Sequence, residues 1–223
     1  DANYTTLSEV KENNKCYSTQ GMAVSDDYLY SIQIKTSDNS RAVIHRIDKK
    51  TGTDTIMTDG TTGLSYFSNL GHANCADWGR VNGVEYLYVL AEAKVVVFRI
   101  EDTTLHPHAE YDLKKSGKAF SPSAMAVYEI NESQITFLLK SGYTVYTGAV
   151  SATAAEGTIS VSVQCYIDVS RVKLDGKVRD FTAFTNQGMG YYNNYLFVPI
   201  TGNEDDATIN QSLILGYDLS KAY

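Results

Sequence analysis

Four polar residues recur in four similar stretches of the sequence, each directly before an apolar run. They are Gln20, His72, Ser123 and Gln187, and Asn74 follows closely on the second. If the four runs surround one axis, these side chains converge on it. They could then bind the hydroxyl groups of a ligand, a water cluster or a metal ion. The same positions also suit a structural role, in which polar groups satisfy buried backbone atoms directly or through water.

We expect no cofactor from the sequence, with a structural cation as the alternative. It could lie on the common axis of the four runs, or in the acidic stretch Glu204, Asp205 and Asp206. Calcium needs six to eight oxygen ligands, and the spacing of the three acids matches no known cation loop, so a solvated turn is the other interpretation.

Catalytic motifs are sparse. The sequence has no Gly-x-Ser-x-Gly, and the repeated polar positions are neutral, without the paired acids that glycoside cleavage requires. Aromatic residues give a stronger indication of function. Tyr143, Tyr191 and Tyr192 lie near expected turns, where they could stack on a sugar or a peptide. The sequence therefore favours binding over catalysis.

The elements that must position these residues are short strands. Each of the four stretches contains alternating or wholly apolar runs bounded by Gly, Asn, Asp and Ser, and none shows a sustained 3.6-residue period. The runs that carry the pattern in the first two stretches are Tyr28-Leu-Tyr-Ser-Ile and Tyr86-Leu-Tyr-Val-Leu. The chain is therefore predicted to be all-β.

The spacing of the repeats predicts a small β-propeller. The starts at 20, 72, 123 and 187 are 52, 51 and 64 residues apart, a period typical of propeller blades. We expect one domain, 1–223, with the N-terminal run completing the last blade and closing the ring, which removes two exposed sheet edges. The expected blades are about 18–58, 70–114, 121–169, and 185–219 plus 5–11. The alternative is part of a propeller with five or more blades.

Composition excludes several classes of partner. The net charge is −7 and no basic stripe occurs, which argues against nucleic acid. No apolar run approaches the ~20 residues that span a bilayer, so the chain is not expected to be transmembrane. Cys16, Cys75 and Cys165 form no disulfide framework and leave at least one thiol free. A start at Asp1 suits a mature chain whose leader has been removed, although any internal start would look the same.

Short motifs resemble those of a known family. The Gln20-Gly-Met-Ala start, the Tyr-Leu-Tyr run and the segment Gly71-His-Ala-Asn look like repeats of secreted bacterial β-propeller proteins of the helveticin J type. The resemblance implies an extracellular protein that acts at a cell surface, with cell-wall or glycan contact and a bacteriocin-like role. Cys75 stands where such repeats often have Asp, so the role of that segment does not carry over directly.

These observations lead to three hypotheses. The first is a secreted or cell-surface recognition module, not an enzyme, that binds a glycan or protein through Gln20, His72, Asn74, Ser123 and Gln187. The second is a hydrolase or lyase acting on cell-wall or cell-surface polysaccharide, with His72 as base. The third is a structural assembly protein whose acidic, Tyr-rich faces pack into larger arrays. The ligand, the source and the oligomeric state stay open.

Overall fold

The fold is all-β, with 60% of the described residues in strands. The structure is a computed structural model, and it describes residues 5–203 and 211–221. Within these ranges the only helical element is one 3₁₀ turn, η1 (Leu219–Lys221). No helix of the described part is long and apolar enough to cross a membrane.

The first two sheets are antiparallel and follow the chain order. The first is formed by β1 (Ser18–Val24), β2 (Tyr28–Ile34), β3 (Ala42–Asp48) and β4 (Asp54–Ile56). The second is formed by β6 (Cys75–Val81), β7 (Val84–Ala91), β8 (Lys94–Glu101), β9 (Thr104–Lys115) and β10 (Lys118–Ala119). Two short segments from other parts of the chain, β5 (Thr58–Asp59) and β14 (Glu156–Ser160), pair parallel with β9.

The third and fourth sheets repeat the arrangement with variations. The third is formed by β11 (Ala124–Ile130), β12 (Gln134–Ser141), β13 (Thr144–Ser151) and β15 (Ser162–Tyr166). A separate hairpin of β16 (Val172–Leu174) and β17 (Lys177–Arg179) follows. The fourth is formed by β18 (Thr185–Asn186), β19 (Gly190–Tyr192), β20 (Tyr195–Gly202) and β21 (Gln211–Asp218). The hairpin explains why the third repeat interval is the longest.

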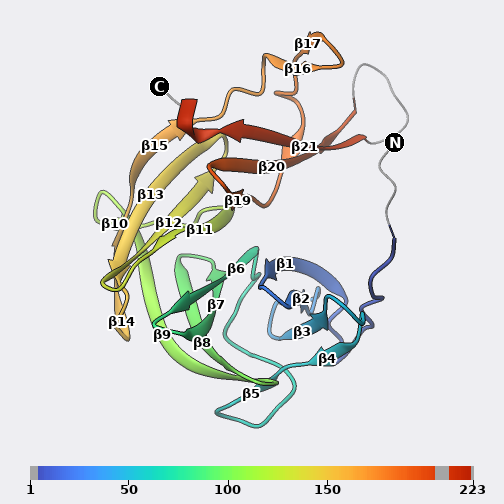
Figure 1. Ribbon diagram of the computed structural model, residues 1–223, viewed down its shortest axis with the longest axis vertical. Coiled ribbons are helices and arrows are strands. Elements are labelled where there is room, and N and C mark those ends of the chain that lie inside the picture. Colours follow the sequence, from blue (N-terminus) through green and yellow to red (C-terminus); the bar gives the residue numbers. More distant parts are fainter. Residues whose placement is uncertain (1–4, 204–210, 222–223) are drawn as a thin grey trace.

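The four sheets follow one another in an arc, with β1, β6, β11 and β19 toward its inside (Figure 1). Apolar side chains fill the space between neighbouring sheets. Tyr30 and Ile32 of the first sheet pack with Leu87 of the second, and Tyr88 on the opposite face of β7 packs with Phe137 of the third. Both faces of β7 are therefore buried, which explains its nearly continuous apolar sequence.

The first and fourth sheets stand at the two ends of the arc, and each has a free face. Met22 and Val24 of β1 are 59% and 50% exposed on the face away from the second sheet. Ile214 of β21 is 73% exposed, whereas Leu196 and Val198 of β20 are fully buried against the third sheet. The expected closure of a four-bladed ring is not seen in the described residues.

The prediction that residues 5–11 form the last strand of the fourth sheet is wrong. These residues have no strand structure. The backbone carbonyl of Leu7 lies over the turn between β3 and β4, where a Cβ at Gly52 would come within 2.2 Å of it. Gly52 also has a positive φ of 71°, so both the turn and the close approach require glycine. The N-terminal segment thus contacts the first sheet, and β21 gains no partner from it.

The inner strands approach each other so closely that one position needs glycine. A Cβ at Gly21 in β1 would lie 2.9 Å from the carbonyl oxygen of Ala73 and 3.2 Å from the carbonyl carbon of Cys75. Both contacts are with backbone, which cannot rotate away. A Cβ at Gly190 in β19, by contrast, would have no other atom within 4 Å.

We therefore expect Gly21→Ala to lower the free energy of unfolding by about 1–3 kcal/mol, because it pushes the first sheet away from the second. Gly190→Ala, on another inner strand, is the matched control and should leave stability within about 0.5 kcal/mol. Urea unfolding followed by tryptophan fluorescence measures both. Equal effects of the two substitutions would contradict the close packing of β1 on β6.

Candidate functional site

One large cavity lies where the four inner strands face each other. Its volume is about 1050 Å³, and residues of all four sheets line it. We call it the central cavity. Its wall includes Gln20, Met22, Val24, Asp26, Lys49, Asn74, Cys75, Asp77, Trp78, Ser123, Val127, Gln187, Tyr191, Tyr192, Phe197, Pro199 and Ile214. The free faces of the first and fourth sheets are parts of this wall.

The structure brings four of the five predicted site residues to the central cavity. Gln20, Asn74, Ser123 and Gln187 all line it, whereas His72 does not. Gly71 and Ala73 have positive φ angles of 54° and 47° on either side of His72, so the chain turns there before β6 begins. His72 therefore has no place in the chemistry of this cavity, and the suggested base must be another residue.

Asp77 in β6 is the charged residue that the sequence analysis missed. Its Oδ1 accepts a hydrogen bond from the backbone N–H of Trp78 at 2.8 Å, and its Oδ2 accepts one from Val127 of β11 at 2.7 Å. Burial raises the pKa of this carboxyl to about 6, and the two N–H donors only partly oppose that rise. Asp77 is thus an acid in the cavity wall that is still half protonated near pH 6.

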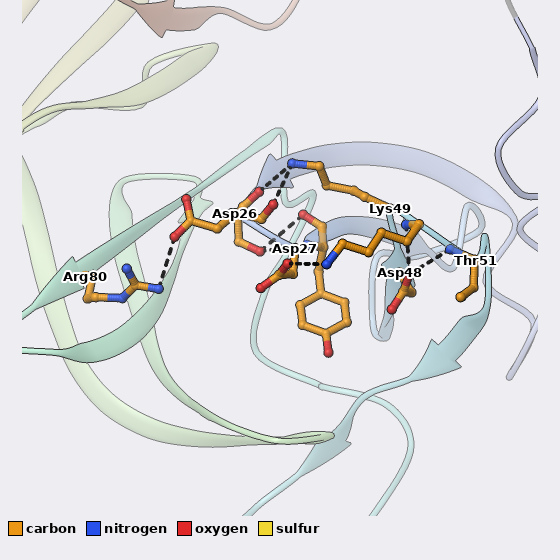
Figure 2. A network of polar contacts seen from close by, with 9 residues as sticks. Asp26, Asp27, Asp48, Lys49, Thr51 and Arg80 are labelled. Carbon is orange, nitrogen blue, oxygen red and sulfur yellow. Dashed lines mark hydrogen bonds and ion pairs between the residues drawn. The ribbon is translucent and has the colours of Figure 1, made fainter.

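A cluster of polar contacts fixes the rim of the cavity beside the first sheet (Figure 2). The Asp26 carboxylate lies 3.1 Å from the guanidinium of Arg80, which also pairs with Glu85 at 2.7 Å. Lys49 Nζ donates to the backbone carbonyls of Ser25 and Asp26 at 3.0 and 2.9 Å. These contacts connect the first sheet to the second and hold a second carboxylate at the cavity.

Aromatic side chains provide the apolar part of the wall. Tyr192 is 69% exposed, and Phe197 stacks on Tyr195 with ring centroids 6.4 Å apart. On the opposite side the guanidinium of Arg80 lies over the Trp78 ring, 5.2 Å from its centroid. Exposed rings beside carboxylates suit a ligand that has both apolar faces and hydroxyl groups.

The described residues contain no group of three or more His, Cys, Asp or Glu side chains placed to hold a metal ion. The acidic stretch Glu204, Asp205 and Asp206 lies outside the described residues. Cys16, Cys75 and Cys165 are all free thiols. Cys75 lies in the cavity wall, and its Sγ donates to the backbone carbonyl of Met125 at 3.0 Å. Burial raises the pKa of this thiol, which favours its neutral form.

No protein-family model and no curated protein matches the chain. Among solved structures it is similar to an α-L-arabinofuranosidase from Lactobacillus brevis, at 9% identity and a TM-score of 0.46, over 94% of this chain and 72% of that one. It is similar to the catalytic domain of a GH62 α-L-arabinofuranosidase from Coprinopsis cinerea, at 9% identity and a TM-score of 0.44, over 94% and 67%. It is also similar to a GH43_1 enzyme from Xanthomonas citri complexed with xylose, at 10% identity and a TM-score of 0.31, over 82% of both chains. The chain is also similar to a putative 6-phosphogluconolactonase from Bacteroides uniformis, at 10% identity and a TM-score of 0.42, over 86% of this chain and 55% of that one.

These matches correct one hypothesis of the sequence analysis. A recognition module without enzymatic activity was the first expectation, whereas the two similar structures from Lactobacillus brevis and Coprinopsis cinerea are α-L-arabinofuranosidases. The paired acids whose absence favoured that hypothesis were sought only at the repeated polar positions. Asp26 and Asp77 line the cavity a few residues further along the chain.

The raised pKa of Asp77 predicts a pH-dependent stability. The folded protein holds this proton up to about pH 6, whereas the ordinary value is 3.8. A proton held more tightly in the folded state stabilises it at low pH, and that stabilisation is lost as the pH rises from about 4 to about 6. Asp77→Asn cannot ionise and should therefore become more stable relative to wild type across this range, by about 3 kcal/mol.

Urea unfolding of both proteins at several pH values between 4 and 8 measures this difference. The Asp27→Asn variant, which changes a carboxylate on the surface, should show no such trend. A difference between wild type and Asp77→Asn that stays constant with pH would contradict the burial of an ionisable carboxyl at this position.

Proposed function

We propose that the chain is a hydrolase that acts on a carbohydrate bound in the central cavity. The observation that carries the proposal is the Asp77 carboxyl, an acid with a pKa of about 6 in the wall of a cavity lined by aromatic rings. Glycoside cleavage needs a carboxyl group that is still protonated near neutral pH and a second carboxylate that is ionised. Asp26, which forms an ion pair with Arg80, is that second group.

The roles follow from the environment of each acid. Asp77 is buried and donates its proton to the oxygen of the leaving group. Asp26 is exposed to solvent and ion-paired with Arg80, and its role is either to activate water or to stabilise the positive charge developing on the sugar. The volume of about 1050 Å³ accommodates several sugar units. Tyr192 and Phe197 offer flat apolar faces on which sugar rings stack.

We also propose the finer features of the architecture and setting. The four sheets are four blades of a β-propeller that is open between the first and the fourth blade. The enzyme acts outside the cell on cell-wall polysaccharide. The resemblance of its Gln-Gly-Met-Ala and Gly-His-Ala-Asn motifs to helveticin J-type proteins supports this setting, and the hydrolase role replaces the bacteriocin-like one as the activity to test first.

Replacement of either acid should abolish most of the activity. We expect Asp77→Asn and Asp26→Asn each to lower kcat/KM by about 10²- to 10⁴-fold, because each removes one partner of the acid–base pair. Asp27→Asn, the neighbouring residue outside the cavity lining, should keep wild-type activity. Release of reducing sugar from bacterial cell-wall polysaccharide and from arabinoxylan measures all three.

For wild type, kcat/KM should fall as the pH rises through about 6, since Asp77 loses the proton that it donates. Absence of sugar release from both polysaccharides at pH 4–6 would overturn the proposal. Full activity of Asp77→Asn would overturn the role of that residue, but not the proposal that the central cavity binds the carbohydrate.

The aromatic wall should contribute to binding more than to the chemical step. Tyr192→Ala removes an exposed ring from the fourth sheet, and we expect it to raise KM about 3- to 10-fold with little change in kcat. Tyr17→Ala removes a ring of similar exposure outside the cavity lining and is the control. Equal KM values for the two variants would show that the fourth sheet does not contact the substrate.

A further inference from the structure

Lys140 of β12 is buried in a way that lysine rarely is. Its relative exposure is 0%, and it forms no ion pair with a carboxylate among the described residues. A lysine of this kind is an amine enclosed by protein without a compensating charge. Lys140 is not required by the proposed hydrolase, so its burial needs another explanation.

Three oxygen atoms surround the Lys140 amine. Nζ is in direct contact with Oδ1 of Asn186 in β18, lies 3.2 Å from Oγ of Ser123 and lies 3.5 Å from the carbonyl oxygen of Gly142. All three are neutral. Loss of water around the ammonium group lowers the pKa of Lys140 to about 8. At that pH half of the molecules carry a neutral amine, which is a nucleophile, against the side-chain carboxamide of Asn186.

We propose that Lys140 and Asn186 form an intramolecular amide cross-link between the third and fourth sheets. The neutral Nζ attacks Cγ of Asn186, the Nζ–Cγ bond forms, and the Cγ–Nδ2 bond breaks. One proton passes from Nζ to the departing nitrogen, which leaves as ammonia. A primary amine and a primary carboxamide thus give one secondary amide and ammonia, and no oxidant or other reactant is needed. The hydrogen bond from Nζ to Oδ1 holds the amine beside the carboxamide whose Cγ it attacks.

The cross-link joins a sheet that is packed on one face only. The fourth sheet packs on the third with one face only, and its other face is open to the central cavity. A covalent bond from β12 to β18 closes a loop of 46 residues (186 − 140) and so limits the freedom of the unfolded chain. The fourth sheet is thereby fixed at one edge of the cavity without a further sheet behind it.

Intact-mass spectrometry of the purified wild-type chain tests the proposal directly. We expect a mass about 17 Da below the value calculated from the sequence, which is the mass of one ammonia molecule. Tryptic digestion should then leave the bond after Lys140 uncut and give one branched product, in which residues 119–171 are joined to residues 180–221.

Two variants distinguish the cross-link from other losses of ammonia. Lys140→Met and Asn186→Ala should each show the full calculated mass and no branched product. If these variants fail to fold, the wild-type digest alone decides. A wild-type mass equal to the calculated value, or a deficit of about 17 Da that maps to another Asn, would overturn the proposal. Neither result depends on hydrolase activity.

Discussion

The structure depends on how the inner edges of neighbouring sheets meet. Each inner strand is the edge of its own sheet, so its outward N–H and C=O groups have no partner within that sheet. Asp77 of the second sheet satisfies one of these groups, because its Oδ2 accepts a hydrogen bond from the N–H of Val127 in the third sheet at 2.7 Å. The Cys75 thiol donates to the Met125 carbonyl beside it, and Gly21 lets the first sheet approach the second. Side chains at the centre therefore connect sheets that share no backbone ladder there.

The same constraint gives the cavity its chemistry. A carboxylate placed to bridge two sheets is necessarily shielded from water, and this burial is what keeps its proton to about pH 6. Above that pH the carboxyl must ionise inside the protein, which lowers the stability of the fold. The same burial produces an acid that can donate a proton near neutral pH. Asp26 experiences the opposite environment, because it lies on the rim and pairs with Arg80. Two carboxyl groups at one cavity thus differ in environment, because one connects sheets and the other faces solvent.

The sequence predicted the repeated strands because local alternation of apolar residues determines them. It also predicted that Gln20, Ser123 and Gln187 share one cavity, since equal positions in equal repeats meet around the inside of an arc. His72, the fourth member of that set, does not line the cavity, whereas its neighbour Asn74 does. It failed for residues 5–11, whose alternating pattern suits a strand but whose partner is set by the path of the chain over Gly52. Asp77 was missed because its importance comes from a bond to a residue fifty positions away, and the contact of Lys140 with Asn186 is equally non-local. One signal was present, namely a lone carboxylate between Ala76 and Trp78 in a mostly apolar inner strand.

The central claim is that Asp77 is a protonated acid in the wall of the cavity. Carbon-13 NMR titration of the side-chain carboxyls, with Asp77 assigned by the signal that disappears in Asp77→Asn, tests it most directly. The account predicts a midpoint for Asp77 near 6, above the ordinary value of 3.8 for an aspartate. A midpoint at or below the ordinary value would contradict it, since the two backbone N–H bonds would then outweigh burial and Asp77 would be only an ionised bridge between two sheets.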